Sequence, residues 1–201
     1  MGGRSHRAGK LKVIVYLHGF CSSPQSNKAQ RLKAFMEARG LGHQFWCEQL
    51  PPSPRAAIAL AGRQIAASAT PVTVVGSSLG GYYATHLAEK HGIKAVLVNP
   101  AVVAHLSLAE FVGPQTNLYT GEVFEFRPEY IEELRAIEVP RLTRPQDFLL
   151  LLETGEEVLD YRQAVARYAG ARQVVLQGGD HSFTRWDDYL GSLLEFAGLV
   201  R

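Results

Sequence analysis

The fold of this chain is decided by the stretch Val72-Thr73-Val74-Val75-Gly76-Ser77-Ser78-Leu79-Gly80-Gly81. It joins a β-branched run, typical of a strand, to a Gly-x-Ser-x-Gly motif and then to a helix-compatible segment. A serine at so sharp a turn occupies a strained backbone position, so the residues two before and two after it must be as small as glycine. Gly76 and Gly80 stand at those positions around Ser78, whereas Ser77 lacks such a pair. We therefore predict that Ser78 is a nucleophile presented on a strand-to-helix turn.

An apolar run near the N-terminus predicts another buried strand, which ends in His18-Gly19-Phe20. In α/β-hydrolases, a loop after an early strand supplies one backbone N–H to the oxyanion hole, and the residue after the nucleophile supplies another. We therefore expect the N–H groups of Phe20 and Leu79 to hold the oxyanion. Gly19 would let the backbone approach the substrate, and His18 is expected to shape this substrate-binding loop rather than to act as a catalyst.

A glycine-rich loop near the C-terminus carries the candidate base. The loop contains Gly178-Gly179-Asp180-His181 and follows a short apolar strand. A histidine in the loop after the last strand can reach the nucleophile across the carboxyl edge of a parallel sheet. None of the other six histidines follows a late strand, as the chain order serine, acid, histidine requires. We therefore predict that His181 is the general base.

The acid that would orient this base is expected in the turn after the preceding strand, within TGEEVLD at 154–160. Its position in the turn makes Glu156 the first candidate, followed by Asp160 and then Glu157. Asp160 also fits the N-cap of the helix that follows. Glutamate can replace aspartate here, because the acid only orients the imidazole and stabilises its cation. The residues leave Glu156 and Asp160 open as alternatives.

Strands and helices alternate along the chain, as a doubly wound sheet requires. We expect an α/β-hydrolase fold: a mainly parallel sheet of about six strands, with helices on both faces. The expected strands lie near 11–17, 44–47, 72–75, 94–98, 147–152 and 172–176, and the expected helices near 27–39, 55–68, 79–91, 161–168 and 186–196.

The chain length of 201 residues suits one domain, expected at 11–201 after a flexible polar arm at 1–10. The stretch at about 101–146 is longer than one crossover helix needs, so we expect a cap-like insertion over the serine. Its apolar side chains could pack on the sheet as ordinary core or line the substrate pocket as a lid. The sequence leaves both possibilities open.

Charge and composition exclude several classes of protein. The net charge of +2 gives no reason to expect nucleic acid or a membrane surface as a partner. No segment approaches the roughly 20 consecutive apolar residues of a membrane span, and the N-terminus does not resemble a signal peptide. Cys21 and Cys47 are too few for a disulfide framework and lack the spacing of metal ligands. We expect a cytoplasmic protein without metal or cofactor, in which Cys21 lines the substrate pocket as a small residue.

Further strings agree with one known family. They are YLHGF at 16–20 with SSP at 22–24, GSSLGGYYAT at 76–85, VNPAV at 98–102, YTG at 119–121, EVLDYRQAV at 157–165 and GGDHSF at 178–183. In this order, over nearly the whole chain, they resemble the YqiA-type esterases, small bacterial α/β-hydrolases. The resemblance implies hydrolysis of carboxylic esters, with Ser78 as nucleophile and His181 as base. The chain departs from the family at Glu156, where the family has aspartate, so Glu156 and Asp160 stay open.

The function predicted is that of a serine hydrolase, which cleaves small-molecule carboxylic esters with short to medium acyl chains through an acyl-enzyme. An acyl thioesterase would use the same chemistry and is the first alternative. The second alternative, from another class, is a non-catalytic binding module on the same fold. The presence of Ser78, His181, Gly76 and Gly80 argues against the binding module. The fold by itself would not distinguish an enzyme from a binding module. The sequence does not fix the oligomeric state.

Overall fold

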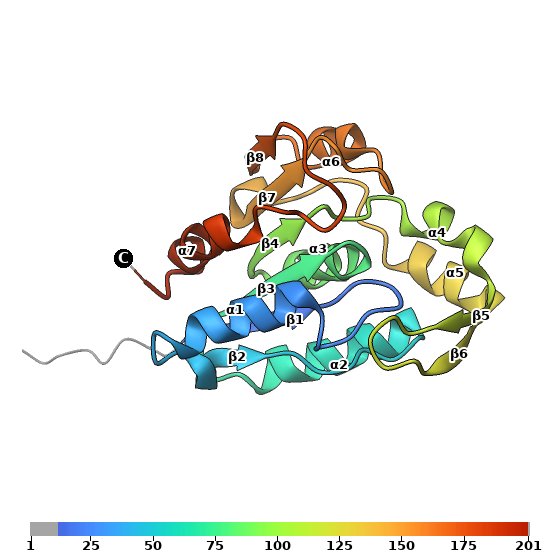
Figure 1. Cartoon of the computed structure of the whole chain (residues 1–201), viewed down its shortest axis with the longest axis horizontal. Helices are drawn as coiled ribbons and strands as arrows, with labels where there is room; N and C mark the ends of the chain where they lie inside the picture. Colours follow the sequence, from blue (N-terminus) through green and yellow to red (C-terminus); the bar gives the residue numbers. More distant parts are fainter. Residues whose placement is uncertain (1–11, 201) are drawn as a thin grey trace, which may run out of the picture.

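The computed structural model describes residues 12–200 (Figure 1). The arm expected at 1–10 and the start of the first expected strand, Leu11, lie outside the described residues. Within 12–200 the main sheet has six parallel strands in the order β2-β1-β3-β4-β7-β8. The strands are β1 (Val13–Leu17), β2 (Phe45–Trp46), β3 (Val72–Ser77), β4 (Lys94–Val98), β7 (Phe148–Glu153) and β8 (Arg172–Leu176).

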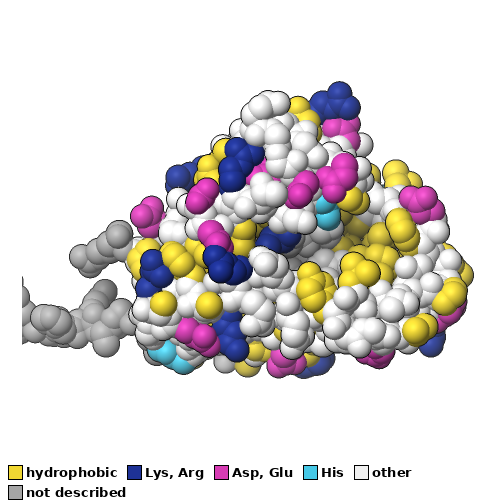
Figure 2. All heavy atoms as spheres, in the orientation of Figure 1, with side chains coloured by type: hydrophobic (Ala, Val, Ile, Leu, Met, Phe, Trp, Pro, Cys, Tyr) yellow, Lys and Arg dark blue, Asp and Glu magenta, His cyan; other side chains and the backbone are white. Residues whose placement is uncertain are grey.

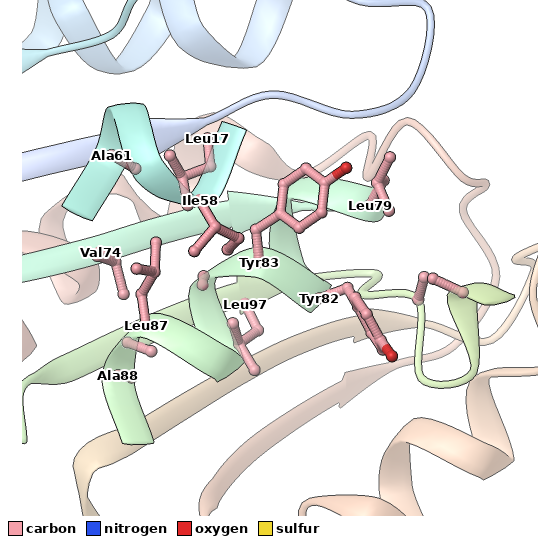
Figure 3. Packing of buried hydrophobic residues seen from close by; sticks show 14 of the residues in the cluster. Leu17, Ile58, Ala61, Val74, Leu79, Tyr82, Tyr83, Leu87, Ala88 and Leu97 are labelled. Atoms are coloured by element: carbon pink, nitrogen blue, oxygen red, sulfur yellow. The ribbon is translucent and has the colours of Figure 1, made fainter. Parts of the chain in front are cut away.

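Helices cover both faces of this sheet. On one face lie α1 (Asn27–Glu37) and α7 (Trp186–Ala197), and on the other lie α2 (Pro54–Ala67), α3 (Leu79–His91) and α6 (Tyr161–Arg167). Successive residues of a strand point to opposite faces, and the central strands are therefore apolar at nearly every position. Figure 3 shows one of the two resulting cores, where Leu87 of α3 lies beside Val74 and Leu97 of the sheet. The fold class predicted from the sequence is confirmed.

The boundaries of these elements agree with the expected ranges to within two residues wherever the chain is described. A short 3₁₀ turn, η1 (Gly42–Gln44), precedes β2. No helix within residues 12–200 is both long enough and apolar enough to cross a membrane.

Between β4 and β7 the chain leaves the sheet. This segment forms α4 (Ala104–Ser107), η2 (Ala109–Phe111), an antiparallel hairpin of β5 (Gly113–Thr116) and β6 (Val123–Phe126), α5 (Pro128–Ala136) and η3 (Pro145–Asp147). Leu108, Phe126 and Leu134 are buried, whereas Leu118 is 81% exposed and Tyr119 is 48% exposed. The apolar residues of the insertion are therefore divided between core and surface. Hydrogen bonds from Leu118 N to Cys21 O (2.8 Å) and from Asn117 Nδ2 to Ser22 O (2.8 Å) join the hairpin to the loop after β1.

Candidate active site

Ser78 lies at the junction of β3 and α3 with φ = 55° and ψ = −122°. A positive φ is uncommon for a residue other than glycine and indicates a backbone held under strain by its surroundings. The surroundings are crowded at the two expected glycines. A Cβ atom at Gly76 would collide with the carbonyl oxygen of Gly80, and one at Gly80 would collide with the carbonyl oxygen of Leu17. The sharp turn therefore requires both glycines, for the steric reason expected from the motif.

This crowding predicts opposite effects for two glycine substitutions. Gly80→Ala should lower the free energy of unfolding by about 1–3 kcal/mol or more, because the new methyl group overlaps main-chain atoms that cannot move aside easily. At Gly62, inside α2, an added Cβ would meet no atom of residues 12–200 within 4 Å beyond the neighbouring helix backbone. Gly62→Ala is therefore the matched control and should be neutral or stabilising by up to about 1 kcal/mol. Urea unfolding of both variants checks this, and equal stabilities would contradict it.

The two expected oxyanion donors are free to bind a ligand. Within residues 12–200, neither the N–H of Phe20 nor the N–H of Leu79 donates to another protein group. Leu79 begins α3, whose N-terminal end carries a partial positive charge. A Cβ atom at Gly19 would lie 3.8 Å from Ser78 Oγ, so the loop after β1 passes directly beside the serine. Their role as oxyanion hole stays a prediction.

The imidazole of His181 is held by Glu156. Nδ1 of His181 lies 2.6 Å from Oε2 and 2.8 Å from Oε1 of Glu156, whose side chain is only 1% exposed. Oε1 of Glu156 also accepts the backbone N–H groups of Val158 and Leu159, which fixes the carboxylate. Because Nδ1 donates to the carboxylate, Nε2 is left as the proton acceptor of the neutral ring. Glu156 thus stands where a triad acid would stand.

The alternative acid has other partners. Asp160 accepts the N–H of Arg162 at the start of α6 and pairs with the Arg162 guanidinium at 2.8 Å. It is the helix N-cap that the sequence also allowed. Glu157, the third candidate, accepts the backbone N–H of His181 at 2.9 Å and does not contact its ring. Of the three carboxylates, Glu156 alone contacts the imidazole.

Ser78 and His181 line one cleft of about 540 Å³, together with Leu118 and Tyr119 from the insertion. Figure 2 shows this hollow in the middle of the face, with hydrophobic side chains gathered toward the β5–β6 hairpin. Among the described residues the Ser78 hydroxyl makes no hydrogen bond to His181. Such contacts often tighten only when substrate is bound, so this arrangement is compatible with catalysis.

A smaller cavity of about 200 Å³ shares Gly19 and Phe20 with this cleft and is also lined by His18, Cys21 and Leu79, among others. His18 Nε2 accepts the N–H of Leu50 at 3.0 Å, and its Nδ1 donates to the carbonyl oxygen of Gly19. Burial lowers the pKa of His18, which keeps the ring neutral and suits a loop-shaping role. Burial raises the pKa of the Cys21 thiol, which makes it a poorer nucleophile.

Asn99, which the sequence reasoning did not single out, connects the loop that carries His181 to the sheet. It follows β4, is 2% exposed and has a positive φ of 39°. Its Nδ2 donates to the carbonyl oxygens of Asp180 (3.0 Å) and His181 (3.2 Å), and its Oδ1 accepts the N–H of Glu153 (3.1 Å). One buried amide therefore fixes the backbone of His181 relative to the ends of β4 and β7.

Glu153 is the second residue that the sequence reasoning missed. It ends β7, is completely buried, and accepts the N–H groups of Asp180 and Thr184 and the guanidinium of Arg185 at 2.9 Å. Burial alone would raise the pKa of Glu153, but the hydrogen bonds from Arg185, Thr184 and Asp180 outweigh it and the pKa is lowered. The available signal was a carboxylate directly after five strongly apolar strand residues.

Within residues 12–200 no group of three or more His, Cys, Asp or Glu side chains is arranged to hold a metal ion.

Solved hydrolase structures resemble this chain along nearly its whole length. A proposed hydrolase from Agrobacterium vitis S4 is 17% identical with a TM-score of 0.71, covering 98% of this chain and 95% of that chain. Est1E from Butyrivibrio proteoclasticus is 15% identical with a TM-score of 0.67, covering 94% and 88%. The esterase domain of a Rhodothermus marinus protein is 18% identical with a TM-score of 0.67, covering 96% and 88%. At such low identity these similarities show the fold alone, which is that of the α/β-hydrolases.

Family membership comes from the sequence itself. A family model described as "Uncharacterised protein family (UPF0227)" matches residues 13–198, which is nearly all of the chain that the structure describes. The match spans every string on which the resemblance to the YqiA-type esterases depends. The chain therefore belongs to this family of YqiA-like esterases.

Proposed function

We propose that this protein is a serine esterase that cleaves small-molecule carboxylic esters with short to medium acyl chains. The observation that carries the proposal is the hydrogen bond of the buried Glu156 carboxylate to His181 Nδ1, in the same cleft as the strained Ser78. This combination of strain, buried charge and an oriented ring costs stability and is hard to explain as packing.

In the first step, His181 Nε2 removes the proton of the Ser78 hydroxyl as Oγ attacks the ester carbonyl carbon. The carbonyl oxygen becomes an oxyanion, which the N–H groups of Phe20 and Leu79 receive. Each such donor typically contributes about 2.7–4 kcal/mol to stabilisation of the transition state. The protonated imidazole is stabilised by the Glu156 carboxylate.

Collapse of this intermediate breaks the bond to the leaving alcohol, whose oxygen takes the proton from His181 Nε2. Water then enters, loses a proton to His181 and attacks the acyl-enzyme carbonyl carbon. The second tetrahedral intermediate releases the carboxylic acid and returns the proton to Ser78 Oγ. The cycle needs no group other than those of the chain and one water molecule.

The limited size of the cavities supports short to medium chains. The smaller cavity, of about 200 Å³, is lined in part by Phe20, Leu50 and Phe124 and would hold a short acyl chain against these apolar side chains. Acyl thioesters undergo the same steps, and a series of matched esters and thioesters of increasing chain length separates the two substrate classes.

The first test is covalent labelling of the serine. Treatment with a fluorophosphonate should add one adduct to the wild type and none to Ser78→Ala, because only an activated serine attacks phosphorus at a useful rate. Intact-mass measurement reads the result. Circular dichroism of both proteins is the control for folding. A folded wild type that stays unlabelled would overturn the esterase proposal and favour a binding module.

A further inference from the structure

A lysine lies in the cleft that holds Ser78 and His181. The ammonium of Lys28 donates one hydrogen bond, to the carbonyl oxygen of Ser182 at 2.8 Å, and Lys28 lines the cleft. Among residues 12–200 no carboxylate oxygen lies within 4.0 Å of it as an ion-pair partner. An ammonium group has three donors, so Lys28 can donate further hydrogen bonds into the cleft.

The carboxylates around Lys28 are bound to other groups. Glu156 is hydrogen-bonded to His181, Glu153 is paired with Arg185, and Asp180 accepts the N–H of Ser182. Asp187, which also lines the cleft, is paired with Arg31. Burial lowers the pKa of Lys28, while Asp180, Glu156 and Glu153 oppose that shift. Burial has partly desolvated the Lys28 ammonium group, so an anion that entered the cleft would be stabilised by pairing with it.

The start of α1 adds a second, independent feature at the same place. This helix has 11 residues, no acidic residue in its first turn and no side-chain cap. Within the described chain, the N–H groups of Asn27, Lys28 and Ala29 donate to no protein group. Ser26 lines the cleft at 7% exposure, and within residues 12–200 its Oγ makes no hydrogen bond of normal geometry, although the hydroxyl of Tyr16, which also lines the cleft, lies beside it. Free N–H groups and the helix dipole both favour an anion here.

The backbone of this segment is held in place. The indole N–H of Trp186 donates to the carbonyl oxygen of Lys28 at 3.0 Å, which ties the first turn of α1 to α7. Arg31, one turn further along, is ion-paired with Asp187 of α7. The backbone N–H groups of Asn27 and Lys28 are therefore preorganised, so an anion would bind them without the cost of ordering them.

We infer that Ser26, Asn27 and Lys28 form a subsite for an anionic group, a carboxylate or a phosphate, on the leaving alcohol of the substrate. The alcohol half belongs on this side because His181 protonates the leaving oxygen, and His181 lines this cleft and not the smaller cavity. The ester bond is cleaved as above: the acyl group passes to Ser78 Oγ and the alcohol leaves with its anionic group unchanged. The inference rests on the proposed function.

Two substrates that differ in one charge test it by kinetics. The butyryl esters of 4-hydroxybenzoate and of 4-hydroxybenzamide have leaving groups of nearly equal size. Lys28→Gln should lower kcat/KM for the charged ester about 10-fold or more and change that for the neutral ester less than about 2-fold. Lys28→Arg, which keeps the charge, should retain most of the preference. Equal losses on both esters would mean that Lys28 only supports Ser182, and would overturn the inference.

Equilibrium binding gives a readout that does not need turnover. Calorimetry on Ser78→Ala, with and without Lys28→Gln, would use 4-hydroxybenzoate, phenyl phosphate and neutral 4-hydroxybenzamide as probes. We expect at least one anion to bind more tightly than the amide, and Lys28→Gln to abolish the difference. The two anions distinguish a carboxylate from a phosphate site. Equal binding of all three probes overturns the subsite. Anion binding to Ser78→Ala, combined with no ester turnover by the wild type, overturns the esterase proposal and leaves the anion site standing.

Discussion

Glu156→Gln is expected to lower kcat by about 10⁴-fold, the size of loss seen when the acid of a serine hydrolase triad becomes an amide. An amide at this position can no longer stabilise an imidazolium. Its NH₂ group would also face either His181 Nδ1 or the N–H groups of Val158 and Leu159, which now donate to Glu156 Oε1. The ring would then turn or change tautomer. Steady-state hydrolysis of a short-chain ester measures the effect.

Asp160→Asn is the matched control for this prediction. It makes the same chemical change four residues away, at a side chain that caps α6 and pairs with Arg162. Asparagine is as good an N-cap as aspartate, so stability and kcat should both change little, within about 3-fold for kcat. The reverse result, with a large loss at position 160 and a small one at position 156, would show that the acid had been assigned to the wrong carboxylate.

These two carboxylates also show where sequence reasoning reaches its limit. Both lie in the turn after β7 and both suit an acid role by residue type, so local sequence could not decide between them. The decision depends on where the ring of His181 comes to lie, 25 positions further along the chain from Glu156. That position is fixed by the pairing of β7 with β8 and by the course of the loop that follows.

The strand-to-helix turn at Ser78, by contrast, was predictable because its steric constraint is local in the sequence. The positive φ of Ser78 and the close approach of Gly80 to the backbone of β1 can be met only by particular small residues at fixed spacing. The apolar strands were predictable for a similar reason, since burial on both faces leaves almost no polar position. The β5–β6 hairpin lacks such a signal: GPQT and VFEF are short, exposed in part and include a proline, and only the excess length of the crossover indicated an insertion.

Asn99 and Glu153 were missed because their partners are distant in sequence. Asn99 reaches residues 81 and 82 positions away, and Glu153 collects donors 27 to 32 positions away. A polar residue at the end of an apolar strand is usually solvated, so neither stood out. Their burial, and the convergence of both on the loop of His181, are properties of the tertiary structure.

Glu153→Gln is expected to lower the free energy of unfolding by about 2–4 kcal/mol. The completely buried carboxylate accepts from the backbone N–H groups of Asp180, Thr184 and Arg185, from the Thr184 hydroxyl and from the Arg185 guanidinium, and an amide would leave some of these donors unpaired. Because the same groups hold the loop of His181, kcat should fall as well. Urea unfolding measures the stability, and an unchanged midpoint would show that the buried carboxylate contributes nothing.

The pH dependence of stability provides the sharper form of this test. The pKa of Glu153 is lower in the folded protein than in the unfolded chain, so its contribution is fully present above the unfolded value near 4.5 and is lost as the pH falls toward the lowered folded value. The stability difference between wild type and Glu153→Gln should therefore be constant at neutral pH and shrink below about pH 4.5. A difference that stayed constant down to pH 3 would show that protonation of Glu153 does not weaken the fold, and that its charge does not hold the loop of His181 in place.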